Sequence, residues 1–521
     1  MIARHTRLAD RIRPRSRRPD EDGYILAAVL GLLLVIMLFL GLITDATSTE
    51  IVTSARLSNR DFAQSEARSG YDAFLGQLEA NPSFITSGAY KNYPAVSGWE
   101  TINPNGSISP CPTSGVVACY RIKVTNNPAV SSSGLQVHPE SATVTVEATY
   151  DCNGSGFGFC SDAAYQADLV RRSYLDYLYF NNHESLAPDL YPSGTQYAYS
   201  SSCNTTLDTA SCLYPVFQAN PSGGNADVID GPVHTNSPWF LVCGDPTFDG
   251  VVTYATGGTG ATPGPGCSSP NPTFALGEHG VAPIPLPTPT DVSTLEQIAG
   301  AKYTYSGNTS IFASASGLTI TNGSTTSNLD YPPSGVIYVN GNASIAGVVA
   351  GGLTLVATGN ISVYGNLTYN CAGPGVNVGT PGWYCTGVGG AEPDMTGLIA
   401  DGNIQIDWNS GAGLAVDAAM MAIGGTVYTP GWNSSTTHVS SGVQPVLYIN
   451  GAIVENWQGA FGTYDTSTGT LQSGYAKDFS YDPRMISMQP PWFLTPLAGE
   501  WARVSLSAIP PASSGLGLPA N

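Results

Sequence analysis

Residues 24–43 read YILAAVLGLLLVIMLFLGLI, a run of twenty residues without a charge. At about 1.5 Å of rise per residue, a helix of this length measures roughly 30 Å, enough to cross the hydrocarbon core of a bilayer. The 23 residues before it contain seven arginines, and none follows closely on the other side. Because Lys and Arg accumulate on the cytoplasmic side of membrane helices, the sequence predicts a single-pass protein with a cytoplasmic N-terminus and an exported remainder.

A cleaved secretory signal is the alternative explanation, because it also begins with a basic region. Such a signal has a shorter apolar core and then a small-x-small cleavage site. We instead expect one transmembrane and amphipathic helix within residues 24–82, ended by Asn81-Pro82, since proline cannot continue the helical hydrogen bonds. In its second part the apolar side chains recur mostly at steps of three and four residues: Ile51, Ala55, Phe62, Ala63, Ala67, Tyr71, Phe74, Leu75 and Leu78.

The composition of the 521 residues is that of an extracellular, β-rich protein. Charged residues make up 11%, below the roughly 25% of ordinary soluble domains, and the chain contains 60 Gly and 38 Pro. The formal net charge is −19, and the basic leader, residues 1–23, holds seven of the 19 basic residues but only four of the 38 acidic ones. The exported part is therefore more acidic still, so we expect no nucleic-acid partner.

All ten cysteines follow the apolar run, and their number is even, which predicts disulfides in an exported chain. None has CxxC spacing and no histidine lies at a zinc-like distance, so we expect neither a metal nor a cofactor. Sequence alone does not determine the connectivity, and nearest-neighbour pairing is one choice: Cys111 with Cys119, Cys152 with Cys160, Cys203 with Cys212, Cys243 with Cys267, and Cys371 with Cys385.

Two segments with alternating apolar and polar residues predict half-buried strands in a β-rich head, residues 83–225. They are VVACYRIKVTN at 116–126 and SATVTVEATYD at 141–151. The segment at 165–180, YQADLVRRSYLDYLYF, fits either a strand or a short helix, and residues 181–225 have no usable periodicity.

A different pattern begins near Ile229, where short strands are separated by Gly and Asn. These residues tolerate the positive φ of tight corners, and a corner followed by a short strand, repeated, builds the rungs of a parallel solenoid. We expect a mainly β fold with an irregular right-handed parallel β-solenoid over residues 226–508, a proline-rich connector at 281–292 and a disordered tail at 509–521. A β-sandwich of hairpins is the alternative, because the spacing is irregular. The repeated units are VNGNASI at 339–345, ATGNISV at 357–363, YGNLTY at 364–369, ADGNIQI at 400–406 and YINGAIV at 448–454.

The junction DEDGYILAAV at residues 20–29 resembles a type IV prepilin signal, with a basic leader, acidic residues, a glycine, an aromatic residue and the apolar helix. In that family a membrane-embedded prepilin peptidase cleaves after the glycine, and the new N-terminal residue is usually methylated. The resemblance therefore implies cleavage between Gly23 and Tyr24. Major pilins carry Glu at the fifth mature position, where this chain has Ala28, as in some minor pilins and pseudopilins of the filament tip. A carboxylate there is costly unless it pairs with a neighbouring subunit's N-terminus.

Residues 55–84, ARLSNRDFAQSEARSGYDAFLGQLEANPSF, are similar to the post-membrane helix of PilX-like pilus-assembly proteins. Members of that family often carry a Glu-Ala pair, then Gly and a hydrophobic residue. Here the pairs are Glu66-Ala67 and Gly70-Tyr71, two residues further apart than the tightest family pattern. Segments 169–184, 230–252 and 474–496 also resemble large pilin-like proteins, and the resemblance brings no catalytic residues with it.

Several polar residues invite a functional interpretation, but each has a simpler structural one. His234 has no recognisable Ser or Cys nucleophile near it, so a core or corner histidine is favoured. Asp394, Asp401 and Asp407 suggest polysaccharide cleavage, which needs two carboxyls about 5–10 Å apart in a groove. Neighbouring rungs can provide such a pair, as can any acidic face, and no basic residue for a uronate lies nearby.

Calcium and sugar binding have weaker signals. Asp407-x-Asn409 and Asn225-x-Asp227 are only fragments of a calcium loop. Three tryptophans can stack on sugars if they are exposed, although core packing is the simpler role for most of them: Trp408, Trp432 and Trp457.

These features predict a non-enzymatic, pilin-like component of a type IV pilus or pseudopilus, a minor or tip subunit acting in assembly or surface adhesion. Its expected partners are the prepilin peptidase, other pilins through the N-terminal helix, membrane lipid, and a surface glycan or protein. A helix-anchored adhesin outside any filament is the first alternative. A surface-tethered polysaccharide-acting enzyme is the second.

Overall fold

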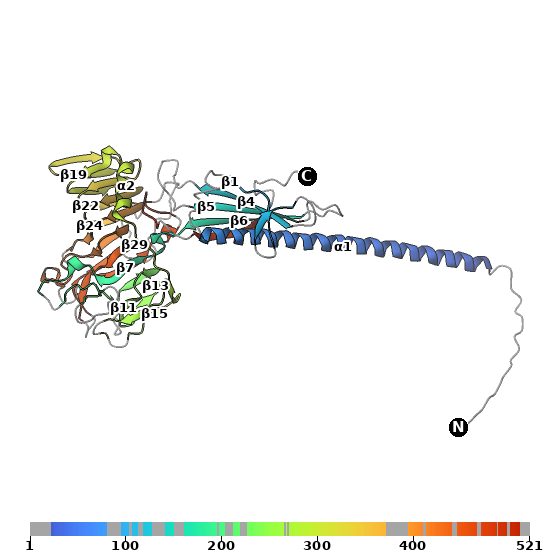
Figure 1. The fold of residues 1–521 in the computed structure, drawn as a ribbon, viewed down its shortest axis with the longest axis horizontal. Coiled ribbons are helices and arrows are strands. Elements are labelled where there is room, and N and C mark those ends of the chain that lie inside the picture. The colour runs from blue at the N-terminus through green and yellow to red at the C-terminus, as the bar shows by residue number, and fades with distance from the viewer. Residues whose placement is uncertain are drawn as a thin grey trace, which may run out of the picture.

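The computed structural model describes residues 22–80, 95–103, 107–112, 118–127, 141–150, 161–194, 197–203, 212–218, 227–264, 267, 270–370, 394–409, 413–439, 445–465, 470–486, 488–496 and 501–510. Within these ranges the chain is mainly β with one long N-terminal helix, as predicted (Figure 1). Most of the expected tail at 509–521 lies outside the described residues.

Helix α1 (Asp22–Ala80) is 59 residues long, or about 90 Å at the usual rise per residue. It ends directly before Asn81-Pro82, so the prediction of one continuous helix is confirmed. Figure 1 shows its N-terminal part extending alone, whereas its C-terminal part lies along a sheet. We call residues 22–62 the bare half and residues 63–80 the docked half.

The first unit consists of the docked half and an antiparallel sheet. Its strands are β1 (Ala95–Val96), β2 (Glu100–Ile102), β3 (Ile108–Pro110), β4 (Ala118–Asn127), β5 (Ser141–Tyr150), β6 (Ser161–Arg171) and β33 (Trp501–Ile509). They lie in the order β3-β2-β4-β5-β6-β33, with β1 paired to β4. The alternation predicted for residues 116–126 and 141–151 is confirmed, because alternate side chains of β4 and β5 join the helix in one core: Tyr120, Ile122, Val124, Val144 and Val146.

The second unit spans residues 174–496 and is inserted between β6 and β33. Its C-terminal half contains β17 (Thr304–Ser306), β18 (Thr309–Ser314), β19 (Gly317–Asn322), β20 (Thr325–Leu329), β21 (Val336–Asn340), β22 (Ala343–Val349), β23 (Gly352–Ala357), β24 (Ile361–Tyr369), β25 (Met395–Ala400), β26 (Ile404–Ile406), β27 (Leu414–Ala422), β28 (Val427–Tyr428) and β29 (Val446–Gln458). Three parallel ladders result. Two are β17-β21-β23-β25-β27-β29 and β18-β22-β24-β26-β28. The third joins the later residues of β22 and β24 to the earlier residues of β27 and β29. Strands β18, β19 and β20 add antiparallel hairpins at one end.

The N-terminal half of the second unit continues these ladders. Its strands are β7 (Tyr179–Leu186), β8 (Phe217–Gln218), β9 (Val228–Asp230), β10 (Val233–Thr235), β11 (Trp239–Cys243), β12 (Thr247–Phe248), β13 (Val252–Ala255), β14 (Gly260–Pro263), β15 (Thr273–Phe274) and β16 (Glu278–Val281). Near the C-terminus lie β30 (Gly462–Tyr464), β31 (Leu471–Gly474) and β32 (Ala476–Tyr481). Strand β29 pairs in parallel with both β7 and β32, which lead into the ladders β7-β10-β13-β16 and β32-β9-β12-β15. The two halves therefore meet at β29.

The proline-rich connector links the two halves. Residues 282–288 are irregular and lead into α2 (Pro289–Ala299), so the last four residues of the predicted connector are helical. Thr288 and Asp291 form a capping box at the start of α2, which explains why the helix begins inside a proline-rich stretch. The connector is tied to the N-terminal half, because Asn236 Nδ2 donates to Ile284 O at 2.7 Å. Short 3₁₀ turns complete the chain: η2 (Tyr174–Asp176), η3 (Pro188–Leu190), η4 (Ala301–Tyr303), η6 (Ser435–Thr437) and η7 (Pro483–Ile486).

The strand pairings divide the chain differently from the predicted boundaries at residues 225 and 508. Residues 179–186 form β7 and pair with β29 and β10, so they belong to the second unit. Residues 501–509 form β33 and pair with β6, so they belong to the first. The ambiguous segment 165–180 changes unit within itself, from β6 through η2 to β7. The assignment of residues 179–186 to the second unit and of residues 501–509 to the first depends on pairing with strands distant in sequence. Local periodicity carries no information on such pairing.

Three of the predicted corners lie side by side and are linked by the side chains of Asn342, Asn360 and Asn403. Asn342 Oδ1 accepts from the backbone N of Asn360, and Asn360 Oδ1 from that of Asn403, both at 2.8 Å. Asn403 Oδ1 in turn accepts from Thr426 N at 2.9 Å. A Cβ at Gly402 would lie 2.4 Å from Asn360 Oδ1, so a side chain here would displace the Asn360 amide from its hydrogen bond to Asn403.

The corners predicted at Gly365-Asn366 and Asn450-Gly451 fall inside β24 and β29, at the points where each strand changes partner. Strand β24 pairs with β26 up to Val363 and with β27 at Leu367, and β29 pairs with β32 up to Gly451 and with β7 from Ile453. Asn366 Oδ1 accepts from Ala415 N at 3.0 Å, a backbone N–H of the neighbouring strand β27. Asn366 therefore links successive rungs in the same way as the other corner asparagines.

Candidate functional site

The bare half of α1 exposes a continuous apolar surface. From Leu26 to Ile43 its large apolar side chains are 44–72% exposed. The helix is long and apolar enough to cross a membrane, and none of its most apolar window is buried inside the protein. An apolar surface of this extent needs a bilayer or protein partners to cover it.

The predicted processing residues lie at the start of this helix. Gly23 and Tyr24 are part of α1, and the surroundings of the Tyr24 side chain lie outside what the structure describes. Ala28 is exposed on the helix surface, in the apolar run. The helix therefore carries a methyl group at the position where a major pilin would carry a carboxylate.

The docked half buries one narrow stripe of the helix against the sheet. Ala67, Tyr71 and Phe74 are at most 2% exposed, at the steps of three and four residues expected for one helix face. Gly70 lies between them, and a Cβ there would be 2.5 Å from the Tyr120 ring of β4. The small residues Ala67 and Gly70 of the family-like motif thus allow close approach of the helix and the sheet.

The docked stripe is shorter than the sequence predicted. Ile51 is 69% exposed and Phe62 is 52% exposed, so they are not part of the buried face. Phe62 still stacks on Tyr150 of β5, with ring centroids 4.8 Å apart, and marks the end of the contact. The periodicity of apolar residues identified which face of α1 packs on the sheet, but not the point along the helix where this contact ends.

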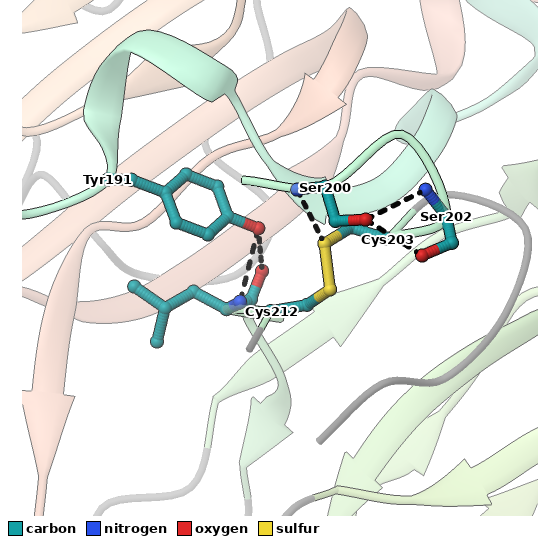
Figure 2. The surroundings of a disulfide bond; sticks show 6 residues. Tyr191, Ser200, Ser202, Cys203 and Cys212 are labelled. Carbon is teal, nitrogen blue, oxygen red and sulfur yellow. Dashed lines mark hydrogen bonds between the residues drawn. A yellow bond between two sulfur atoms is a disulfide. The ribbon is translucent and has the colours of Figure 1, made fainter. Parts of the chain in front are cut away.

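Three disulfides join nearest-neighbour cysteines, as anticipated: Cys111–Cys119, Cys203–Cys212 and Cys243–Cys267. The cysteines at 152, 160, 371 and 385 lie outside the described residues. Figure 2 shows the Cys203–Cys212 bond, where Ser200 N donates to Cys203 Sγ at 3.3 Å. Each disulfide closes a loop between cysteines of the same unit, and none of the three connects the two units.

His234 is a core histidine. It is fully buried, its Nδ1 lies 2.8 Å from Thr253 Oγ1, and its Nε2 lies 2.9 Å from Asn236 Oδ1. Its ring stacks on Phe180 at 4.8 Å. Burial lowers the pKa of His234 to about 4, so the imidazole is neutral at pH 7. His234 is therefore a packed core residue, which is the role that the sequence analysis favoured.

The three aspartates considered for sugar cleavage have separate surroundings. Asp394 and Asp401 lie at opposite ends of β25, whose six residues span about 20 Å. Asp394 Oδ1 accepts from Gly351 N at 2.5 Å, and Asp407 Oδ1 accepts from Ser362 Oγ at 3.0 Å. Burial raises the pKa of Asp401. The pair on β25 is further apart than the two carboxyls of a glycosidase.

The aspartates of the two calcium fragments contact other groups in the described part of the chain: Asp407 accepts from Ser362 Oγ. Asp227 Oδ2 pairs with Lys477 Nζ at 2.7 Å, and Asn225 lies outside the described residues. Across the described part of the chain, no group of three or more His, Cys, Asp and Glu side chains is placed to hold a metal ion.

The tryptophans have different surroundings. Trp408 packs on Tyr475 with ring centroids 4.8 Å apart, and Trp457 packs on His183 at 4.3 Å. Trp432 lines a cavity.

That cavity, which we call the aromatic cavity, has a volume of about 320 Å³, at the lower end of the range for small-molecule sites. Residues 212–216, Trp432 and residues 459–464 contribute to its wall. No local pattern predicted this cavity, because its residues come from distant segments without a shared period. Six aromatic side chains line it: Tyr197, Tyr214, Trp432, Phe461, Tyr464 and Tyr475.

A neutralised ion pair forms the polar side of the aromatic cavity. Lys477 Nζ contacts Asp227 and donates to Val216 O at 3.1 Å. Tyr464 Oη donates to Asp227 Oδ1 at 3.1 Å. Burial and the Asp227 charge raise the pKa of Tyr464, which keeps the phenol protonated.

Two glutamates are buried next to this region. Glu455 on β29 accepts from Val427 N at 2.7 Å, Gly459 N at 3.0 Å and Thr426 Oγ1 at 3.0 Å. Glu184 on β7 accepts from Asn181 Nδ2 at 2.9 Å. Burial raises the pKa of Glu455 to about 7 and that of Glu184 to about 8.

Comparison with solved structures gives a distant likeness to a pilin. The crystal structure of the competence-associated pilin ComZ from Thermus thermophilus is similar to the chain with a TM-score of 0.26 and 12% sequence identity. The alignment covers 87% of this chain and 98% of that one. No family model matches the sequence, and no curated protein matches it.

Proposed function

We propose that the chain is a pilin-like structural component of a type IV pilus or pseudopilus, a minor or tip subunit. The observation that carries the proposal is the division of α1 into an exposed apolar half and a half docked on an antiparallel sheet. One rigid helix of this kind can first lie in a bilayer and then pack among other helices, because both surroundings cover its apolar side chains.

The proposed topology places the arginine-rich leader in the cytoplasm and both β-rich units outside. The prepilin peptidase would cleave between Gly23 and Tyr24, which resemble its recognition junction. Ala28 supports a minor position, since a helix without a carboxylate there lacks one means of pairing with the N-terminus of another subunit.

The second unit would provide the adhesive part. We propose that its parallel ladders are the rungs of an irregular right-handed β-solenoid, supported by pairing of alternate strands in register. In such a stack, the edge of each strand pairs with the next rung, except at the two ends. The long outer faces of the stack remain available for contact with other molecules. The net charge makes a neutral or cationic surface a better partner than nucleic acid.

Mass spectrometry of the N-terminus tests the proposal. The protein is isolated from its own cells, with and without the prepilin peptidase. We expect a mature chain beginning at methylated Tyr24 only where the peptidase is present. Gly23→Val should block processing, because a side chain is introduced at the cleaved position, whereas Ala28→Glu should still be processed.

An intact leader in the peptidase-containing strain would refute the pilin proposal. The chain would then be better described as a helix-anchored adhesin that never enters a filament. The same apolar helix serves both roles, so processing is the measurement that separates them.

A further inference from the structure

The wall of the aromatic cavity is held in place by covalent and hydrogen bonds. Cys212 and Cys267 line the cavity, and each is joined to a residue behind it, Cys203 and Cys243. Tyr191 Oη holds the next residue of this wall, Leu213: it accepts from Leu213 N at 3.1 Å and donates to Leu213 O at 3.3 Å. A wall fixed in this way loses little conformational entropy when a ligand binds.

The charge of the aromatic cavity is balanced. Among the described residues that line it, Lys477 is the one cationic side chain, and no acidic side chain lines it. The Lys477 charge is matched by Asp227 at 2.7 Å and further held by Val216 O. An anionic ligand would have to compete with this buried pair, so the cavity suits a neutral one.

The lining combines flat aromatic faces with hydroxyl groups. Trp432, Tyr197 and Tyr464 are only partly buried, and each has an apolar ring with a polar tip. Thr463 adds a hydroxyl that is hydrogen-bonded to Ser473 Oγ at 2.5 Å. A sugar ring matches such a surface, because it has an apolar face of C–H groups and a rim of hydroxyls.

We infer that the aromatic cavity binds one ring of a neutral sugar at the end or side of a surface glycan. The ring stacks on Trp432, and its hydroxyls exchange hydrogen bonds with the phenols of Tyr197 and Tyr464. This inference deepens the proposed adhesive role, and it rests on the second unit being displayed outside the cell.

Sugar titration of the purified full chain tests the inference, in a detergent without a sugar headgroup. The probes are glucose, galactose, mannose, N-acetylglucosamine and their β-linked disaccharides, with glucuronate as the anionic comparison. We expect saturable quenching of tryptophan fluorescence by at least one neutral sugar, and weaker binding of glucuronate. Trp432→Ala should raise the dissociation constant by more than about tenfold. Trp457→Ala, which removes a tryptophan outside the cavity, should leave it unchanged.

Tyr197→Ala is a second variant, in case Trp432→Ala perturbs folding, and it should also weaken binding, as measured by calorimetry. The inference is overturned if no neutral sugar binds saturably, if glucuronate binds more tightly, or if both cavity variants bind as well as the wild type. Failure here would leave cleavage at Gly23-Tyr24 untouched. The sugar inference and the pilin proposal can therefore fail separately.

Discussion

Two buried glutamates show how single residues link this fold to pH. Glu184 and Glu455 are no more than 1% exposed, and the carboxyl of each accepts hydrogen bonds from buried neighbours. Burial opposes the ionisation of both, and the charge of Glu455 further raises the pKa of Glu184. The folded second unit therefore binds protons more tightly than the unfolded chain does near neutral pH.

The first prediction concerns Glu184. A pKa raised from an ordinary 4.5 to about 8 contributes stability that is complete below pH 4.5 and is lost as the pH rises through 8. Glu184→Gln should therefore reduce the loss of stability between pH 6.5 and 8.5, by up to about 1.4 kcal/mol per pH unit. Urea unfolding across this range measures the slope.

Glu296→Gln, on the exposed face of α2, is the matched control. Its free energy of unfolding should depend on pH with the same slope as that of the wild type. Burial lowers the pKa of His234 to about 4, and its contribution to the slope is the same in the wild type and in both variants, so it cancels in the comparison. An unchanged slope in Glu184→Gln would contradict the proton linkage.

At the scale of elements, the asparagine ladder holds successive corners in register. Asn360 has the central place, since its own N–H is accepted by Asn342 and its Oδ1 accepts the N–H of Asn403. The second prediction is that Asn360→Ala destabilises the second unit by about 1–3 kcal/mol, because the backbone N–H of Asn403 loses its partner. Chemical denaturation at constant pH measures the change.

Asn433→Ala provides the control for the asparagine ladder, because Asn433 is exposed and lies in a turn. It should change the free energy of unfolding by less than about 0.5 kcal/mol. Equal effects of the two substitutions would show that the ladder has no special role.

The third prediction concerns the contact between α1 and its sheet. Gly70→Leu should destabilise the first unit by about 2 kcal/mol or more, since a Cβ already meets the Tyr120 ring at 2.5 Å. Gly76→Ala, one helix face away, has nothing within 4 Å and should be neutral or stabilising by up to about 1 kcal/mol. Hydrogen exchange of the β4 and β5 amides measures the local effect, and similar protection in both variants would argue against close docking.

Much of the element structure could be predicted because the signals are local. The apolar run and the proline at 82 define α1, and the period-two pattern of residues 141–151 defines β5. The Gly-Asn corners at 341–342 and 402–403 were also visible, since tight turns need those residues. The change of strand partner within β24 and β29 was not, because it depends on which strands lie beside these residues.

For the whole molecule, the two units have separate hydrophobic cores, one around Tyr71 and one around Leu355. The fourth prediction is that calorimetry of the full chain resolves two unfolding transitions. Gly70→Leu should lower the midpoint of one transition only, and Asn360→Ala that of the other only. A single transition lowered by both substitutions would mean that the units unfold together.

The pairing of distant segments is what the sequence could not report. Residues 501–509 return to β6 after more than 300 intervening residues, and β7 pairs with β29 across a similar separation. The aromatic cavity has the same origin, since Trp432 and Tyr214 meet only through tertiary packing. Long-range contacts of this kind leave no period in the chain.

The return of the chain at β33 has a mechanical consequence. The chain leaves the first unit after Arg171 and re-enters it at Trp501, and these two residues are paired neighbours on β6 and β33. Tension on the second unit is therefore carried by a double tether that enters the sheet at one point. A proteolytic cut in either strand of the tether leaves the other intact, so an attached unit is not released by a single nick.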